Sequence, residues 1–184
     1  MAFEILDSTG NLVNLNNSSS DTLIPISYTL DTTGKFICCN YPEKLKETMF
    51  GEYDDDNACL NRVTVSSGTH QVFYSYQYNT GEENSAETPF CFGIQFFNLD
   101  ANSPMTLRIT KKGNGTNRFD DMESWLGVAG KTVEQYFSSS PGETIQVAKS
   151  SSYWFEHQLK NYSGLCSGLI EFSVSKPTVV SAYV

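Results

Sequence analysis

Three tyrosines spaced two residues apart are the side chains in this sequence that best suit a binding surface. Tyr74, Tyr76 and Tyr78 occupy alternate positions after Val72, so in a β-strand they share one face, with about 7 Å between neighbours. A tyrosine ring offers an apolar surface on which a sugar stacks, and its hydroxyl adds a hydrogen bond. These residues are therefore candidates for a carbohydrate-binding platform. The alternative is that they are core residues whose hydroxyls reach the edge of the core.

Carboxylates gather in one short stretch, where Asp54, Asp55 and Asp56 follow one another directly. Calcium binds six to eight oxygen ligands, which loops of this kind often supply. The three aspartates are therefore candidate calcium ligands. The EF-hand spacing, with its central glycine and terminal glutamate, is absent, so a solvated acidic loop is the alternative. The sequence indicates no other cofactor.

The oxidation state of the cysteines matters because the chain has an odd number of them: Cys38, Cys39, Cys59, Cys91 and Cys166. If the protein is oxidised, one thiol cannot pair within the chain. Cys38 and Cys39 point to opposite faces of a strand, which suits neither a mutual disulfide nor zinc. One of this pair is therefore a candidate for an intersubunit disulfide. The alternative is that all five are reduced and inert.

The residues needed for catalysis show no recognisable arrangement. The two histidines, His70 and His157, lie outside any known catalytic motif, and an activated nucleophile needs a base that a third group orients. A glycosidase needs two carboxylates at a defined separation, and none of the 21 acidic residues is marked out by its position. We therefore expect a protein that is not an enzyme.

An alternation of apolar and polar residues predicts the strands that position these side chains. It is clear at 23–30, 89–99, 105–111 and 170–174, and weaker at 3–6, 12–15, 35–40, 62–66, 144–148, 153–159 and 179–184. One apolar and one polar face is typical of a half-buried antiparallel strand. Turn-forming residues, such as those at 112–115, separate the strands. The pattern predicts an all-β fold, an antiparallel, jelly-roll-like β-sandwich formed by residues 1–184 as a single domain.

One segment departs from this alternation. Apolar residues recur at helical spacing around 120–138, and capping boxes at 120–123 and 132–135 mark two helix starts. Gly127 and Gly130 lie between them. We therefore expect one or two short helices, bent at these glycines and covering an open end of the sandwich. A further helical turn is expected at 44–50.

The charge of the chain excludes one class of partner. Its 12 basic and 21 acidic residues give a formal net charge of -9, which repels the phosphates that nucleic-acid-binding proteins neutralise with Lys and Arg. No apolar stretch approaches the roughly 18 residues of a membrane span, and the amino-terminal residues lack a signal-peptide pattern. The charged fraction is only 18%, which is typical of exported β-proteins. We expect no nucleic-acid partner, no membrane span, and an extracellular or cell-surface location.

Two stretches of the chain, 60–75 and 89–98, resemble elements of uncharacterised β-rich modules in secreted proteins of Gram-positive, Clostridia-like bacteria. The closing run 172–175 and the helix end at 136–139 are similar too. The resemblance extends from Pro42 to the carboxyl end and rests on hydrophobic and turn residues. It implies a shared fold and assigns no site residue. Cysteine is scarce in those modules, so five cysteines are a departure from them.

These observations favour a non-catalytic extracellular or cell-surface module that builds or decorates an assembly. Its partners would be other copies of itself or surface components. Self-assembly into a fibre or surface layer would use an exposed edge strand or an intersubunit disulfide. The alternative is a carbohydrate-binding module that binds a glycan on the face formed by Tyr74, Tyr76 and Tyr78.

Overall fold

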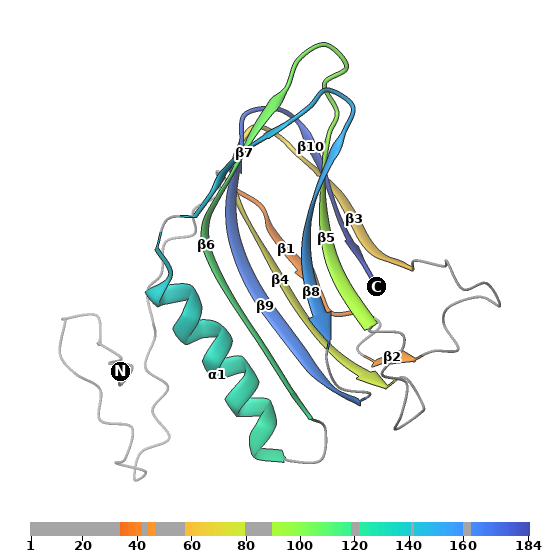
Figure 1. Ribbon diagram of the computed structural model, residues 1–184, viewed down its shortest axis with the longest axis vertical. Helices are drawn as coiled ribbons and strands as arrows, with labels where there is room; N and C mark the ends of the chain where they lie inside the picture. Colours follow the sequence, from red (N-terminus) through yellow and green to blue (C-terminus); the bar gives the residue numbers. More distant parts are fainter. Residues whose placement is uncertain are drawn as a thin grey trace, which may run out of the picture. The chain divides into compact units, whose positions relative to one another are not determined.

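The computed structural model describes residues 34–41, 44–46, 58–79, 90–118, 122–140, 142–159 and 163–184. The candidate calcium ligands Asp54, Asp55 and Asp56 lie outside the described residues, as do the strands expected at 3–6, 12–15 and 23–30. The described residues belong to one compact unit, Thr33–Val184, and build two β-sheets with a helix on one of them (Figure 1).

The larger sheet has six described strands: β1 (Phe36–Cys39), β2 (Lys44–Lys46), β4 (Gly68–Asn79), β9 (Ser163–Val174), β6 (Met105–Arg118) and β7 (Thr144–Val147). Their order is β1-β4-β9-β6-β7, and β2 also pairs with β4. The two short strands β1 and β2 run parallel to β4, while the other pairs are antiparallel. The short strand β7 pairs only with Met105–Arg108 of β6.

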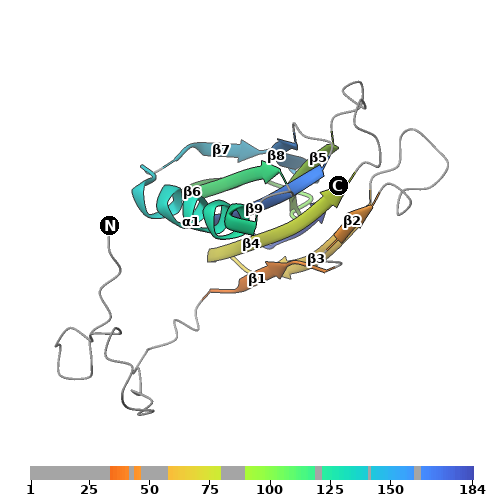
Figure 2. The same ribbon diagram turned by 90° about the horizontal axis from the view of Figure 1, so that it is seen from below.

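The smaller sheet has four described strands: β3 (Cys59–Val65), β10 (Thr178–Tyr183), β5 (Phe90–Asn98) and β8 (Ser152–Leu159). Their order is β3-β10-β5-β8, and every pair is antiparallel. The strand β8 therefore ends this sheet on one side. In Figure 2, β8 lies on the same side of the molecule as β7, the last strand of the larger sheet.

The core lies between the inner faces of the two sheets (Figure 2). Burial alternates along β4, where Val72, Tyr74 and Tyr76 are buried and the residues between them are half-exposed. Rings from the two sheets meet in the middle, since the centroid of Phe92 on β5 lies 4.3 Å from that of Tyr74. The apolar alternation in the sequence thus predicted which residues share a face, and the expected all-β sandwich is confirmed.

The helix α1 (Met122–Ser138) lies against the outer face of the six-stranded sheet, over β6 and β9 (Figures 1 and 2). It does not cover an end of the sandwich, so that expectation is wrong. Two glycines of β6 allow the close approach. A Cβ atom at Gly113 would overlap the carbonyl oxygen of Thr132, and one at Gly115 would lie 2.9 Å from the carbonyl oxygen of Val128.

This close approach also corrects the turn expected at 112–115. The glycines there are strand residues, and β6 continues to Arg118. The sequence signal was misleading because glycine serves both in turns and where two backbones approach each other.

The helix is continuous, so the bend expected at Gly127 and Gly130 is absent. Both glycines are exposed, and a Cβ atom at either would meet nothing within 4 Å. Packing holds the helix in spite of them. The Tyr136 hydroxyl donates to Glu171 Oε2 at 3.1 Å and accepts from Gln71 Nε2 at 2.8 Å, which ties the end of α1 to the sheet.

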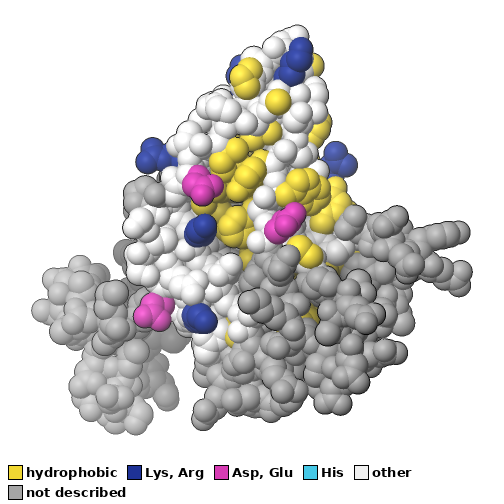
Figure 3. All heavy atoms as spheres, in the orientation of Figure 1, with side chains coloured by type: hydrophobic (Ala, Val, Ile, Leu, Met, Phe, Trp, Pro, Cys, Tyr) yellow, Lys and Arg dark blue, Asp and Glu magenta, His cyan; other side chains and the backbone are white. Residues whose placement is uncertain are grey.

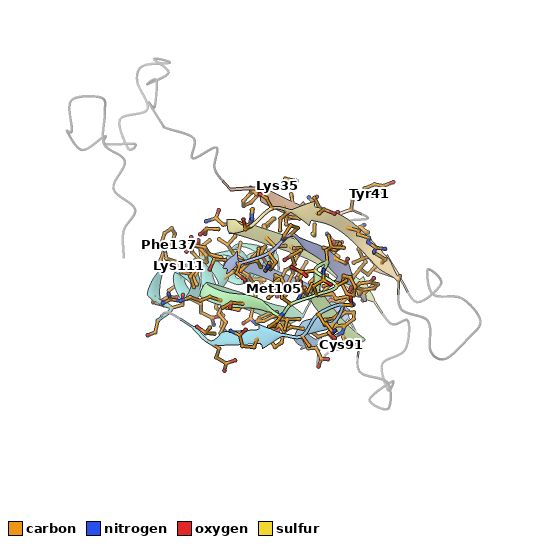
Figure 4. All side chains as sticks on the ribbon, turned by 90° about the horizontal axis from the view of Figure 1, so that it is seen from above. Lys35, Tyr41, Cys91, Met105, Lys111 and Phe137 are labelled. Carbon is orange, nitrogen blue, oxygen red and sulfur yellow. The ribbon has the colours of Figure 1, made fainter. Side chains whose placement is uncertain are left out.

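The helical turn expected at 44–50 is wrong at its start, because Lys44–Lys46 form strand β2. No described helix has the length and apolar character needed to cross a membrane. Figure 4 shows Met105 between the sheets, with Lys111 and Phe137 together on the side of the helix.

Candidate functional site

The three tyrosines do not form an exposed platform. Tyr74, Tyr76 and Tyr78 are at most 1% exposed and belong to the core. Tyr74 lies directly opposite Gly168 on β9, and a Cβ atom at that glycine would overlap the tyrosine ring. A sugar cannot stack on rings that the opposite sheet already covers. The carbohydrate platform at these residues is therefore wrong, and the core alternative holds.

The two adjacent cysteines do point to opposite sides of β1, as expected. Cys38 is exposed and Cys39 is 2% exposed. The side chain of Asn61 on β3 lies beside them and donates from Nδ2 to the carbonyl oxygen of Cys38 at 3.1 Å. Cys38, Cys39, Cys59 and Cys166 are thiols that form no disulfide. Cys38 therefore remains the member of the pair that another molecule can reach.

His70 is a structural residue. Its Nδ1 accepts a hydrogen bond from the backbone N–H of Lys35 at 3.0 Å, and its Nε2 lies 2.9 Å from the carbonyl oxygen of Ser66. Both ring nitrogens are thus occupied by backbone groups, and the ring is 2% exposed. No proton acceptor is left for a substrate.

An exposed aromatic side chain is found instead on β8, where Tyr153, Trp154 and Phe155 follow one another. Tyr153 and Phe155 pack against the core, and Trp154 is 41% exposed on the other face of the strand. The Trp154 ring centroid lies 5.2 Å from that of Tyr183 on β10. Gly93 on β5 makes room for it, since a Cβ atom there would already touch Trp154 Cε3 at 3.4 Å.

Polar side chains continue the outer face of the four-stranded sheet from this aromatic pair. Gln95 lies directly opposite Trp154, Ser181 opposite Gln95, and Arg62 opposite Ser181. Residues opposite each other in neighbouring strands share a face, so the four make a row about 14 Å long across the sheet. The Ser181 hydroxyl is buried and lacks a hydrogen-bond partner among the described residues. Trp154 and Arg62, at the two ends of the row, are exposed.

A groove of about 640 Å³ lies on the inner side of β8. Its walls come from β6, from the connection between α1 and β7, and from β8: Ile109, Lys112, Gly142, Glu143, Tyr153, Trp154, Phe155 and Glu156. It lies just beyond β7, where the backbone of Ile109 on β6 is hydrogen-bonded to Gly142 and Glu143. Figure 3 looks onto this side and shows hydrophobic side chains gathered between acidic and basic ones.

Charged groups border the apolar part of the groove. The Lys112 ammonium nitrogen lies 5.9 Å from the centroid of the Phe155 ring, within reach of a cation–π interaction. Glu143 and Glu156 are exposed, and neither side chain forms a hydrogen bond or ion pair with another described residue. Burial, and then the negative charge of Glu143, raises the pKa of Tyr153. The groove therefore combines the inward-facing rings of Tyr153 and Phe155 with Glu143 and Lys112, while Glu156 shares the outer face of β8 with Trp154.

We call Tyr153, Trp154, Phe155 and Tyr183, together with Glu143 and Glu156, the β8 site. The sequence predicted the strand and did not assign it a site. The available signal was three consecutive aromatic residues, because such a run places rings on both faces of a strand. Among the described residues, no group of three His, Cys, Asp or Glu side chains is arranged to hold a metal ion.

Comparison with known proteins finds no relative of this chain. No protein-family profile, curated protein or solved structure matches the chain.

Proposed function

We propose that this protein is a non-catalytic carbohydrate-binding module that uses the β8 site. The observation that carries the proposal is Trp154, an indole that is 41% exposed and lies against Tyr183 on the outer face of the four-stranded sheet. A pyranose ring presents apolar C–H groups on one face and hydroxyls around its edge. The C–H groups match an indole surface, and the hydroxyls match polar neighbours such as Gln95 and Arg62.

The rest of the site supports a chain of several sugars. Trp154 belongs both to the outer face and to the groove wall, so an oligosaccharide that crosses the edge strand could contact both surfaces. Pockets for organic ligands combine aromatic walls with a few polar groups that fix orientation. Tyr153 and Phe155, with Glu143 and Lys112, supply this combination in the groove.

The test is calorimetric titration of the protein with soluble neutral hexasaccharides of glucose, mannose and N-acetylglucosamine. Trp154→Ala should weaken binding about fivefold or more, because loss of an aromatic stacking contact costs about 1 kcal/mol or more. Phe137→Ala is the matched control, since Phe137 is also exposed but lies on α1. Unchanged binding by Trp154→Ala, or no binding of any hexasaccharide by the wild-type protein, would overturn the proposal.

A second candidate function is assembly at the cell surface, as the composition of the sequence suggests. Two observations favour it: β8 and β3 are the terminal strands of the four-stranded sheet, and the Cys38 thiol is exposed beside β3. A terminal strand offers backbone groups to a second chain, and an exposed thiol can link two subunits. The mass in solution with and without a reductant tests both routes. A monomer under both conditions would exclude them.

A further inference from the structure

The strand β8 has a backbone edge that pairs with no other described strand, because β8 pairs with β5 alone. The backbone N–H of Asn98 donates to the carbonyl oxygen of Ser151 at 2.9 Å, so these opposite residues form a hydrogen-bonded pair. Such pairs alternate along an antiparallel ladder, which directs the N–H and C=O groups of Trp154 and Glu156 away from β5. Neither residue forms a backbone hydrogen bond with a described residue of another element.

The groove beneath this edge has an apolar inner wall. Tyr153 and Phe155 face it from β8, and Ile109 faces it from β6. Side chains of an extended chain alternate between two faces. A strand added to β8 would therefore direct every second side chain into the groove. The sequence that fits has apolar residues at alternate positions.

The chain itself contains such a sequence at 23–30, outside the described residues. Four apolar residues alternate there with Pro25, Ser27 and Thr29: Ile24, Ile26, Tyr28 and Leu30. If this segment runs parallel to β8 with the apolar residues inward, the apolar residues also make the backbone hydrogen bonds to β8. The nitrogen of Pro25 then faces away from β8, on the free side of an edge strand, where proline is tolerated.

We propose that residues 23–30 of one copy add as a parallel strand to the β8 edge of a second copy, with Ile24, Ile26 and Tyr28 in the groove. This inference deepens the assembly candidate and does not depend on the sugar-binding proposal. Donor segment and acceptor groove are different surfaces, so each copy can give one strand and receive another. A head-to-tail contact of this kind builds a ring or a fibre.

The length of the chain favours a second copy over the same copy as donor. Leu30 is four residues from Gly34, so at most about 14 Å of extended chain joins them. Gly34 precedes β1, which lies beside β3. Three strand spacings, about 14 Å, separate β3 from β8. A path around the outside of the sandwich is longer than this direct distance, so Leu30 does not reach the groove of its own copy.

Sedimentation velocity in the presence of a reductant tests the donor segment, since the reductant removes any disulfide contribution. We expect wild-type protein to form oligomers whose mass rises with concentration. Ile26→Gln should weaken this association about tenfold or more, because a buried apolar side chain is lost. Ser27→Gln is the matched control. It places the same side chain at the neighbouring position, which faces away from the groove, and should associate as the wild type does.

Mixing two variants tests the acceptor edge. Glu156→Pro removes an N–H that points to the open edge and leaves the hydrogen bonds to β5 in place. It should fail to associate alone and form a one-to-one heterodimer with Ile26→Gln, which keeps an intact groove. A synthetic peptide of residues 22–31 should also bind Ile26→Gln in a one-to-one ratio. The peptide keeps the acceptor testable if Glu156→Pro disturbs folding.

Two results would overturn the inference. One is association of Ile26→Gln as strong as that of the wild type, which leaves assembly by another surface standing. The other is failure of the peptide to bind Ile26→Gln. A wild-type protein that stays monomeric with and without reductant would remove this inference and the assembly candidate together. The sugar titrations with Trp154→Ala are unaffected by either result.

Discussion

At the scale of single residues, burial divides the cysteines into two chemical classes. Cys38 and Cys59 are exposed. Cys39 and Cys166 are at most 2% exposed, and burial raises the pKa of Cys39 to about 11 and that of Cys166 to about 12. The thiolate is the reactive form of cysteine. Adjacent positions in the sequence, such as 38 and 39, therefore differ in reactivity because they face different surroundings.

We predict that native protein treated with iodoacetamide at pH 8 is alkylated at Cys38 and Cys59 before Cys39 and Cys166. At that pH a thiol with a pKa of 11 is about 0.1% ionised, whereas an ordinary cysteine, with a pKa of about 8.5, is about one quarter ionised. Peptide mapping by mass spectrometry measures the order. Alkylation of Cys166 as fast as Cys38 in the folded protein would contradict the assignment, and denaturation should make the four equivalent.

At the scale of elements, glycine decides where α1 packs. Gly113 and Gly115 leave β6 without side chains under the helix, so that the backbones of strand and helix approach closely. Gly127 and Gly130 lie on the exposed surface of the same helix, where nothing is near. The four glycines are chemically identical, and their surroundings give alanine substitutions opposite effects.

We predict that Gly113→Ala lowers the free energy of unfolding by about 1–3 kcal/mol, the range for an overpacked site, because its methyl group would overlap the Thr132 carbonyl. Gly130→Ala is the matched control and should raise it by up to about 1 kcal/mol, since alanine favours a helix over glycine. Urea denaturation followed by circular dichroism measures both. Equal effects of the two substitutions would mean that α1 does not pack against Gly113.

Burial of one strand face also explains how much of these elements the sequence predicts. Alternation identified most of the strands, because the face that each buries sets a period of two. It could not decide whether Tyr74 is a core residue or a platform. Period two says only that side chains share a face, and the covering residue, Phe92, comes from another strand. The sequence did not mark Trp154 as a site residue for a related reason. Its exposed position depends on Tyr183 and Gly93, which lie on other strands of the sheet.

At the scale of the whole molecule, charge sets the partners that the surface admits. The formal net charge of -9 gives the protein a field that repels polyanions and attracts cations. An acidic surface of this kind is compatible with a neutral ligand. It is unfavourable for a ligand built on phosphates.

We predict that the protein does not bind duplex or single-stranded DNA at physiological salt. The reason is that binding to the phosphate backbone needs a surplus of Lys and Arg, and this chain has 12 of them against 21 acidic residues. A gel-shift titration measures it. A micromolar complex that weakens as salt is added would show a basic surface that the net charge conceals.

The order of strands has a consequence for how the molecule is made. β9 lies between β4 and β6 in one sheet, and β10 lies between β3 and β5 in the other, although these two strands are the last described in the chain. During synthesis, the earlier strands therefore leave the ribosome with the central place in each sheet still empty. Neither sheet can close until residues 163–183 have emerged. Pairing strands so distant in sequence slows folding, and strand edges left unpaired in that interval favour aggregation.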